Sequence, residues 1–215
     1  MNTARMFDWL QLGALACLGC LGLGRALALY ARGVRVLVVD RQRSPAEMAR
    51  DLLLVICLLL WVYETVACAW PLPVHAVPWL DVVLVDAVAA KAAGAAVLAA
   101  AIAVYGQAVW AMGDSWRMGI DRQRPGTLVT GGVFAWTRNP IYLSLDLFLF
   151  GTFLVLGRLV FLAIAAVMVV LLDDQIRREE RFLAAAHGEP YREYCARAGR
   201  YVSFPFGRRG SGRRS

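Results

Sequence analysis

The chain has 215 residues, 60% of them hydrophobic, and a mean hydropathy of +0.56. This composition excludes an ordinary soluble domain and indicates a polytopic membrane protein. The net charge of +7 is carried by basic segments between apolar runs, which is a pattern of membrane topology, so we predict no nucleic-acid partner. Five scattered cysteines and two histidines indicate neither a disulfide framework nor a metal site.

Five apolar segments predict an all-α bundle of about five transmembrane helices, at residues 9–30, 52–70, 82–110, 140–157 and 159–176. The first is long enough to cross a hydrocarbon core of ~30 Å at ~1.5 Å per residue. The third is too long for one perpendicular crossing, so we expect its early part, with Asp81 and Asp86, to be interfacial or tilted. Asp86 and Lys91 are too far apart round a helix for the favoured pairing.

A polar link at residues 31–51 precedes the second span. Ser44 is expected to cap a short helix that has Pro45 at its first position and Glu47 at its third. Glu64 lies inside the second span, where an acid is costly. Glu64 is therefore either paired or functional, or it reaches the interface from near the outer end of the helix.

The polar loop before the fourth segment ends in Arg138, Asn139 and Pro140. Asn139 is a favoured N-cap and Pro140 suits the first helical position, so a helix is predicted to begin at about Pro140. A helix N-terminus offers free backbone N–H groups and a positive dipole end, and Arg138 adds a full charge beside it. These features predict an anion site at a membrane boundary.

The fourth and fifth segments are separated only by Gly157-Arg158, which favours a tight antiparallel hairpin. The fifth helix is expected to continue past the membrane and to stop at His187-Gly188. Because a hairpin returns its two ends to one side, Arg138 and the pair Glu179-Glu180 should come together. Taken alone, the charge run around this pair is also typical of a solvated helix face.

Three blocks, in a fixed order, carry a resemblance to a known family. They are Arg138-Asn-Pro-Ile-Tyr142, Glu179-Glu180-Arg-Phe-Leu183 and Gly188-Glu-Pro-Tyr191-Arg-Glu-Tyr194. The chain resembles the isoprenylcysteine carboxyl methyltransferase and phospholipid methyltransferase superfamily of integral membrane enzymes over residues 105–205. We expect a single membrane domain at residues 1–206, followed by a basic tail at residues 207–215.

In this superfamily the blocks bind S-adenosylmethionine, so the resemblance implies a methyltransferase that uses this cofactor. Arg138 and the first amides of the fourth helix would complement the cofactor's carboxylate, and Glu179 or Glu180 its ammonium or ribose. Tyr142 and the aliphatic pair at 128–129 would cover the adenine. The predicted cofactor-binding residues are Leu128, Val129, Arg138, Asn139, Pro140, Tyr142, Glu179 and Glu180, and the predicted catalytic residues are Arg138 and Glu180.

Arg117 and Asp146 are weaker candidates for contacts with the substrate. Arg117 is either a second anion contact or an ordinary positive charge on the cytoplasmic side. Asp146 follows Tyr142 by four residues on the same helix face, and it either orients a cofactor amine or bonds to a neighbouring helix. The acceptor is expected to be a lipophilic molecule that enters sideways from the lipid and is methylated on O, S or N.

The sequence is also compatible with other functions. Asn139 stands where the prenylcysteine enzymes carry His, so prenylcysteine is not the expected substrate. Membrane sterol reductases that use NADPH share a similar C-terminal pattern, but their acidic residue after the Asn-Tyr element has no match at Leu143-Ser144. A non-catalytic membrane scaffold or transporter would bind no cofactor.

The positions of Lys and Arg predict the orientation in the membrane. Residues 31–51, residues 113–138 and the part from 177 onward hold nineteen of the 23, whereas the link at 71–81 holds none. We predict an N-terminus outside and a C-terminus in the cytoplasm, in the bacterial inner membrane. The arginines after Phe206, among glycine and serine, are expected to touch anionic lipid headgroups.

Overall fold

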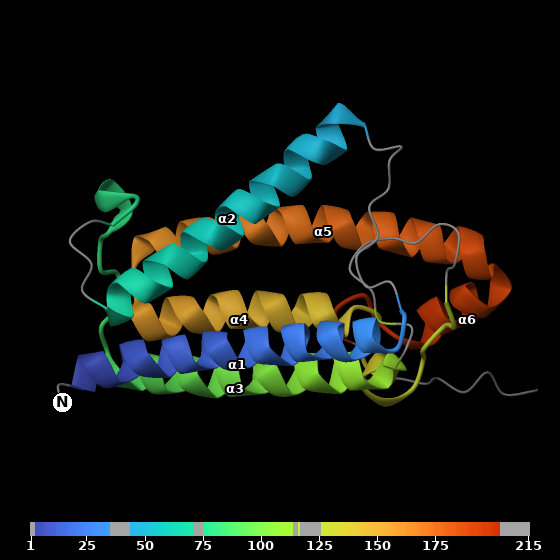
Figure 1. The fold of residues 1–215 in the computed structure, drawn as a ribbon, viewed down its shortest axis with the longest axis horizontal. Coiled ribbons are helices and arrows are strands. Elements are labelled where there is room, and N and C mark those ends of the chain that lie inside the picture. Colours follow the sequence, from blue (N-terminus) through green and yellow to red (C-terminus); the bar gives the residue numbers. More distant parts are fainter. Residues whose placement is uncertain (1–2, 35–43, 71–74, 114–115, 117–125, 203–215) are drawn as a thin grey trace, which may run out of the picture.

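The computed structural model describes residues 3–34, 44–70, 75–113, 116 and 126–202 (Figure 1). Its α-helices are α1 (Thr3–Ala31), α2 (Pro45–Ala69), α3 (Val88–Ala111), α4 (Pro140–Leu156), α5 (Leu159–His187) and α6 (Glu189–Arg197). Two short 3-10 helices, η1 (Pro78–Leu80) and η3 (Gly132–Ala135), lie in the connections. In these described ranges the only β pairing is two isolated bridges. The prediction of an all-α fold is confirmed.

Four helices, α1, α2, α3 and α5, are long and apolar enough to cross a membrane. α4 is apolar but has only 17 residues. It forms the predicted antiparallel hairpin with α5, and α5 continues without a break to His187, as expected. The described helices thus agree with a bundle of about five transmembrane helices.

The hairpin packs closely against the other helices of the bundle. A Cβ on Gly94 of α3 would lie 2.9 Å from the carbonyl oxygen of Gly151 of α4, so glycine lets these two backbones approach closely. The apolar core then joins the hairpin to α1, α2 and α3. Its buried members include Phe7, Trp61, Leu98, Phe148 and Phe161.

The turn of the hairpin is fixed by the segment that precedes α3. Gly157 has a φ of +68°, and a Cβ there would lie 1.7 Å from the carbonyl oxygen of Val85. The amides of Leu84 and Val85 donate to the Gly157 carbonyl, and Arg158 pairs with Asp81. The closed turn therefore lies at one end of the bundle, and the open end of the hairpin lies at the other.

Glu64 is paired, so the first of its two interpretations holds. Its side chain is 1% exposed, and it accepts hydrogen bonds from the amides of Ala76 and Val77 at 2.8 and 3.3 Å. His75 Nδ1 lies 2.7 Å from the other carboxylate oxygen. These contacts satisfy the acid within α2 and attach the loop after α2 to the bundle.

Two predicted boundaries are corrected by the structure. α2 is one helix from Pro45, where we expected a short helix followed by a span, and Ser44 and Glu47 form the predicted capping box at its start. α3 begins only at Val88. Asp86 therefore precedes the helix and reaches Lys91 Nζ at 2.7 Å, because the spacing rule that argued against this pair applies only within a helix.

Candidate functional site

The open end of the hairpin brings Arg138 and Glu180 together, as its geometry predicted. The Arg138 guanidinium donates from Nε and Nη2 to Glu180 Oε1, at 3.1 and 2.9 Å. Both side chains are mostly buried, with 13% and 11% of their surface exposed. The start of α4 is thus fastened to α5 by a charge-assisted pair.

Glu180 is the centre of a larger junction that also contains Arg200. Its second oxygen, Oε2, accepts from Nε and Nη2 of Arg200 at 2.9 and 2.7 Å, which raises the pKa of Arg200. Asn139 Nδ2 donates to Glu180 Oε1 at 3.2 Å and to the Arg200 carbonyl at 3.1 Å. Glu180 therefore ties α5, the start of α4 and the segment after α6 into one unit.

Arg138 also holds the end of α6. Its Nη1 donates to the carbonyls of Cys195 and Ala198 at 3.2 and 2.7 Å. With the two bonds to Glu180, four of the five N–H groups of the guanidinium are engaged by the protein. That Arg138 contacts the cofactor's carboxylate stays a prediction; the fifth N–H makes no hydrogen bond to the described residues.

Asn139 occupies the predicted N-cap position of α4, but its side chain makes no cap hydrogen bond. That side chain is turned to Glu180 and Arg200 instead. Pro140 is buried at the first position of the helix, as expected. The amides of Ile141 and Tyr142 in the first turn consequently donate no hydrogen bond to the Asn139 side chain.

A second polar group lies beside this junction. The Tyr142 hydroxyl donates to Glu179 Oε2 at 2.8 Å. Successive residues of an α-helix point about 100° apart, so Glu179 and Glu180 meet different partners. Asp146, on the Tyr142 face of α4, has a buried oxygen, Oδ1, with no hydrogen-bond partner among the described residues. Asp173 of α5 is near enough to act on Asp146 electrostatically.

The third block of the motif contributes packing. Tyr191 and Tyr194 are buried edge to face, with ring centroids 6.1 Å apart, and the Tyr194 hydroxyl donates to the Phe134 carbonyl at 2.7 Å. Burial raises the pKa of Tyr194 to about 12. Leu128 and Val129 are partly buried against this cluster. The structure thus places Leu128 and Val129 beside α6, and Tyr142 beside α5.

Arg117 and the tail at residues 207–215 lie outside the described residues. Arg200 is the junction residue that the sequence did not reveal, because it follows Glu180 by 20 residues and stands outside all three blocks. Over the described part of the chain, no group of three or more His, Cys, Asp or Glu residues is arranged to hold a metal ion.

A family model described as phospholipid methyltransferase matches residues 84–190, about half of the chain. The match contains Arg138, Tyr142 and both glutamates. The chain belongs to this family. Together with the apolar helices, the family makes this chain an integral membrane methyltransferase that acts on lipid-like substrates. A search of curated proteins found no match.

Proposed function

We propose that this methyltransferase uses S-adenosylmethionine and methylates an O, S or N atom of a lipophilic molecule at the open end of the α4–α5 hairpin. The main support for this proposal is the difference in hydrogen bonding between the adjacent residues Glu179 and Glu180. Glu180 is saturated by Arg138, Asn139 and Arg200. Among the described residues, Glu179 accepts one hydrogen bond, from Tyr142, and so keeps capacity for a ligand.

The acidic groups fit the cationic parts of the cofactor, its ammonium and its sulfonium. A buried carboxylate oxygen without a partner is costly unless a donor or a cation meets it. Asp146 Oδ1 is such an oxygen, and it lies one helical turn from Tyr142, whose hydroxyl bonds to Glu179 of α5. We therefore assign the cationic parts to Glu179 and Asp146.

Other groups fit the remaining parts of the cofactor. The first-turn amides of α4, at Ile141 and Tyr142, and the last N–H of Arg138 would hold the carboxylate. The ring of Tyr142 offers a flat apolar surface for the adenine. Contacts from Leu128 and Val129 remain predictions.

The protein's contribution to the reaction is mainly positioning. When bound, the cofactor supplies an electrophilic methyl group, and its in-line displacement depends on orientation and on exclusion of water. Arg138 and Glu180 act as positioning residues, because they hold the start of α4 against α5 and so keep Tyr142 beside Glu179. An anionic acceptor, such as a carboxylate or thiolate, would need no dedicated base.

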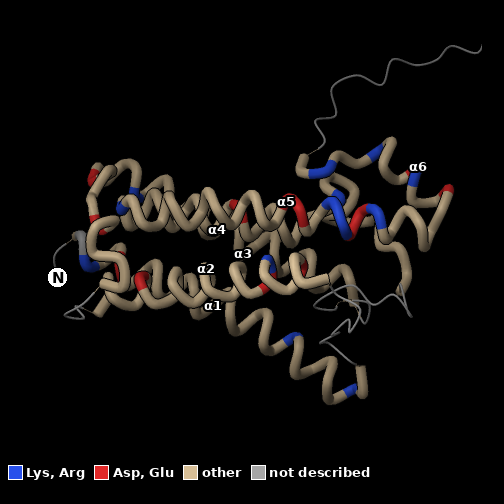
Figure 2. The backbone as a smooth tube through the Cα atoms, turned by 90° about the horizontal axis from the view of Figure 1, so that it is seen from above, with Lys and Arg blue, Asp and Glu red and all other residues tan. Residues whose placement is uncertain are grey.

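We propose further that this end of the bundle faces the cytoplasm. Five crossings put residues 31–51, residues 113–138 and the part from 177 onward at the same end as Glu180, and these segments hold most of the basic residues. Figure 2 shows the charged residues of α5 gathered in its C-terminal part, next to α6. The cofactor would then arrive from the cytosol and the acceptor from the lipid.

The test is calorimetric binding of S-adenosylmethionine to protein purified in detergent, followed by transfer of labelled methyl to a total membrane lipid extract. Glu179→Gln and Asp146→Asn should each weaken binding about 10- to 100-fold, since each removes a charge-assisted contact. The matched control is Glu189→Gln, because Glu189 is an exposed carboxylate paired within α6 with Arg192. Its binding should stay within about twofold of the parent.

Two results would contradict the proposal. If both site variants bind S-adenosylmethionine as tightly as the parent while staying monodisperse, the assigned site is wrong. If the parent binds NADPH instead and reduces an enone lipid, the chain is a reductase.

A further inference from the structure

The N-terminal half of α2 is attached to the bundle differently from the other half. All buried residues of α2 lie at Cys57 or beyond, so residues 45–56 of this helix bury no side chain. Met48 and Leu52 are each 61% exposed. In Figure 1 this half leads away from α5, whereas the C-terminal half crosses close to it.

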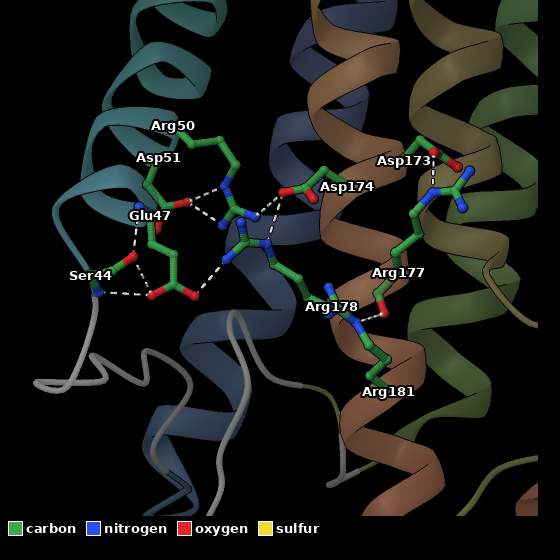
Figure 3. A network of polar contacts seen from close by, with 9 residues as sticks. All are labelled: Ser44, Glu47, Arg50, Asp51, Asp173, Asp174, Arg177, Arg178 and Arg181. Atoms are coloured by element: carbon green, nitrogen blue, oxygen red, sulfur yellow. Dashed lines mark hydrogen bonds and ion pairs between the residues drawn. The ribbon is translucent and has the colours of Figure 1, made fainter.

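Long polar side chains bridge the separation between the two helices (Figure 3). Arg50 Nη1 donates to Asp174 Oδ2 at 3.0 Å, and Arg178 Nε donates to the same oxygen at 2.8 Å. Arg178 also pairs with Glu47 in the first turn of α2. We call the pairs Arg50–Asp174 and Glu47–Arg178 the latch. Because partly exposed ion pairs contribute little stability each, the latch can break and form again at low cost.

The latch lies next to the proposed site. The Arg50 guanidinium is near enough to act electrostatically on the Tyr142 hydroxyl, which bonds to Glu179. Along α2, the less exposed stripe runs from Glu47 and Arg50 through Leu54 to buried Cys57 and Trp61. The face of α2 toward α5 is thus polar at the latch and becomes apolar toward the C-terminus of the helix.

We propose that the N-terminal half of α2 is a lateral gate, closed by the latch, through which the hydrocarbon chain of the acceptor passes between α2 and α5 toward Tyr142 and Glu179. This inference rests on the proposed function. Past the latch, the stripe of α2 that faces α5 is apolar at Leu54, Cys57 and Trp61, so a lipid chain is the occupant that matches it. α2 lies outside residues 84–190, so the family match assigns it no role.

Spin-label distances test the movement directly. The labels are placed at Met48→Cys and Val170→Cys, two exposed positions on α2 and α5, after replacement of the five native cysteines, with the protein in lipid nanodiscs. Arg178→Gln removes the latch pair with Glu47, together with the bond to Asp174 within α5, and should raise the long-distance population about three- to tenfold. Arg177→Gln is the matched control, because Arg177 pairs with Asp173 inside α5. Equal distributions in both variants would overturn the gate.

A reversible lock tests the passage of the acceptor. Glu47→Cys with Arg178→Cys, joined by a short reducible thiol cross-linker, holds α2 to α5. Locking should lower methyl transfer to total membrane lipid about tenfold or more and leave S-adenosylmethionine binding within about twofold, and reduction should restore the rate.

The outcomes separate this inference from the proposed function. If locked and unlocked protein transfer methyl at one rate, the gate is wrong and the proposed function stands. If no form transfers methyl, the proposed function fails, and the gate is then judged on the spin-label distances alone.

Discussion

The contacts of Glu180 predict that replacing it destabilises the fold. Glu180→Gln keeps the size of the side chain but replaces one carboxylate oxygen with an NH₂ group. Whichever way the amide turns, that group faces either Arg138 or Arg200, which can only donate. Each guanidinium gives Glu180 two hydrogen bonds, so at least two bonds are lost.

The cheaper choice for the amide is to face Arg200, which is 34% exposed and can be solvated in part. Hydrogen bonds to charged groups contribute about 1.5–3 kcal/mol each, and exposure reduces this value. We therefore expect a loss of about 2–3 kcal/mol in the free energy of unfolding. For a chain of this size, that loss lowers the Tm by about 4–12 °C.

Thermal unfolding in detergent, followed by tryptophan fluorescence, measures this change. The control is Glu189→Gln, where the lost pair is exposed and the expected change is below about 0.5 kcal/mol. Arg138→Gln combined with Glu180→Gln should cost less than the sum of the single variants, since they share one interaction. If Glu180→Gln and Glu189→Gln have the same Tm, the Glu180 junction does not stabilise the fold as proposed.

Two further predictions concern the turn of the hairpin and the orientation in the membrane. Gly157→Ala should prevent folding or lower the free energy of unfolding by more than about 3 kcal/mol. Gly188 is also at positive φ but has no atom near its Cβ, so Gly188→Ala should cost only about 1–2 kcal/mol. Equal melting temperatures of the two variants would refute the role of Val85 at the turn. A C-terminal reporter should be active only in the cytoplasm, and activity only on the outside would contradict the positive-inside argument.

Local elements could be predicted because their signals lie within a few residues. The Ser44 and Glu47 capping box spans one helical turn. Gly157-Arg158 leaves room only for a tight turn, and Gly188 follows the last residue of α5. The meeting of Arg138 with Glu180 then followed from the antiparallel hairpin itself.

The tertiary contacts could not be predicted, because they depend on distant residues. Asn139 has the side chain of an N-cap, but the carboxylate of Glu180 competes for it, and a charge-assisted bond is stronger than a bond to a backbone amide. Arg200 joins the junction only because α6 folds back. For α2, the apolar run predicted a span, but it did not indicate which half packs against the bundle.

In the proposed function, Glu180 serves folding and the adjacent Glu179 serves binding. One negative charge at Glu180 is shared by Arg138 and Arg200, so this junction carries a net positive charge. In the adjacent region, Glu179 accepts only from a neutral hydroxyl among the described residues, and Asp146 has an unpartnered oxygen, so acceptors are available there for a cation. A ligand with separate anionic and cationic ends matches that division. Substitution of Glu180 should therefore act first on stability, and substitution of Glu179 first on binding.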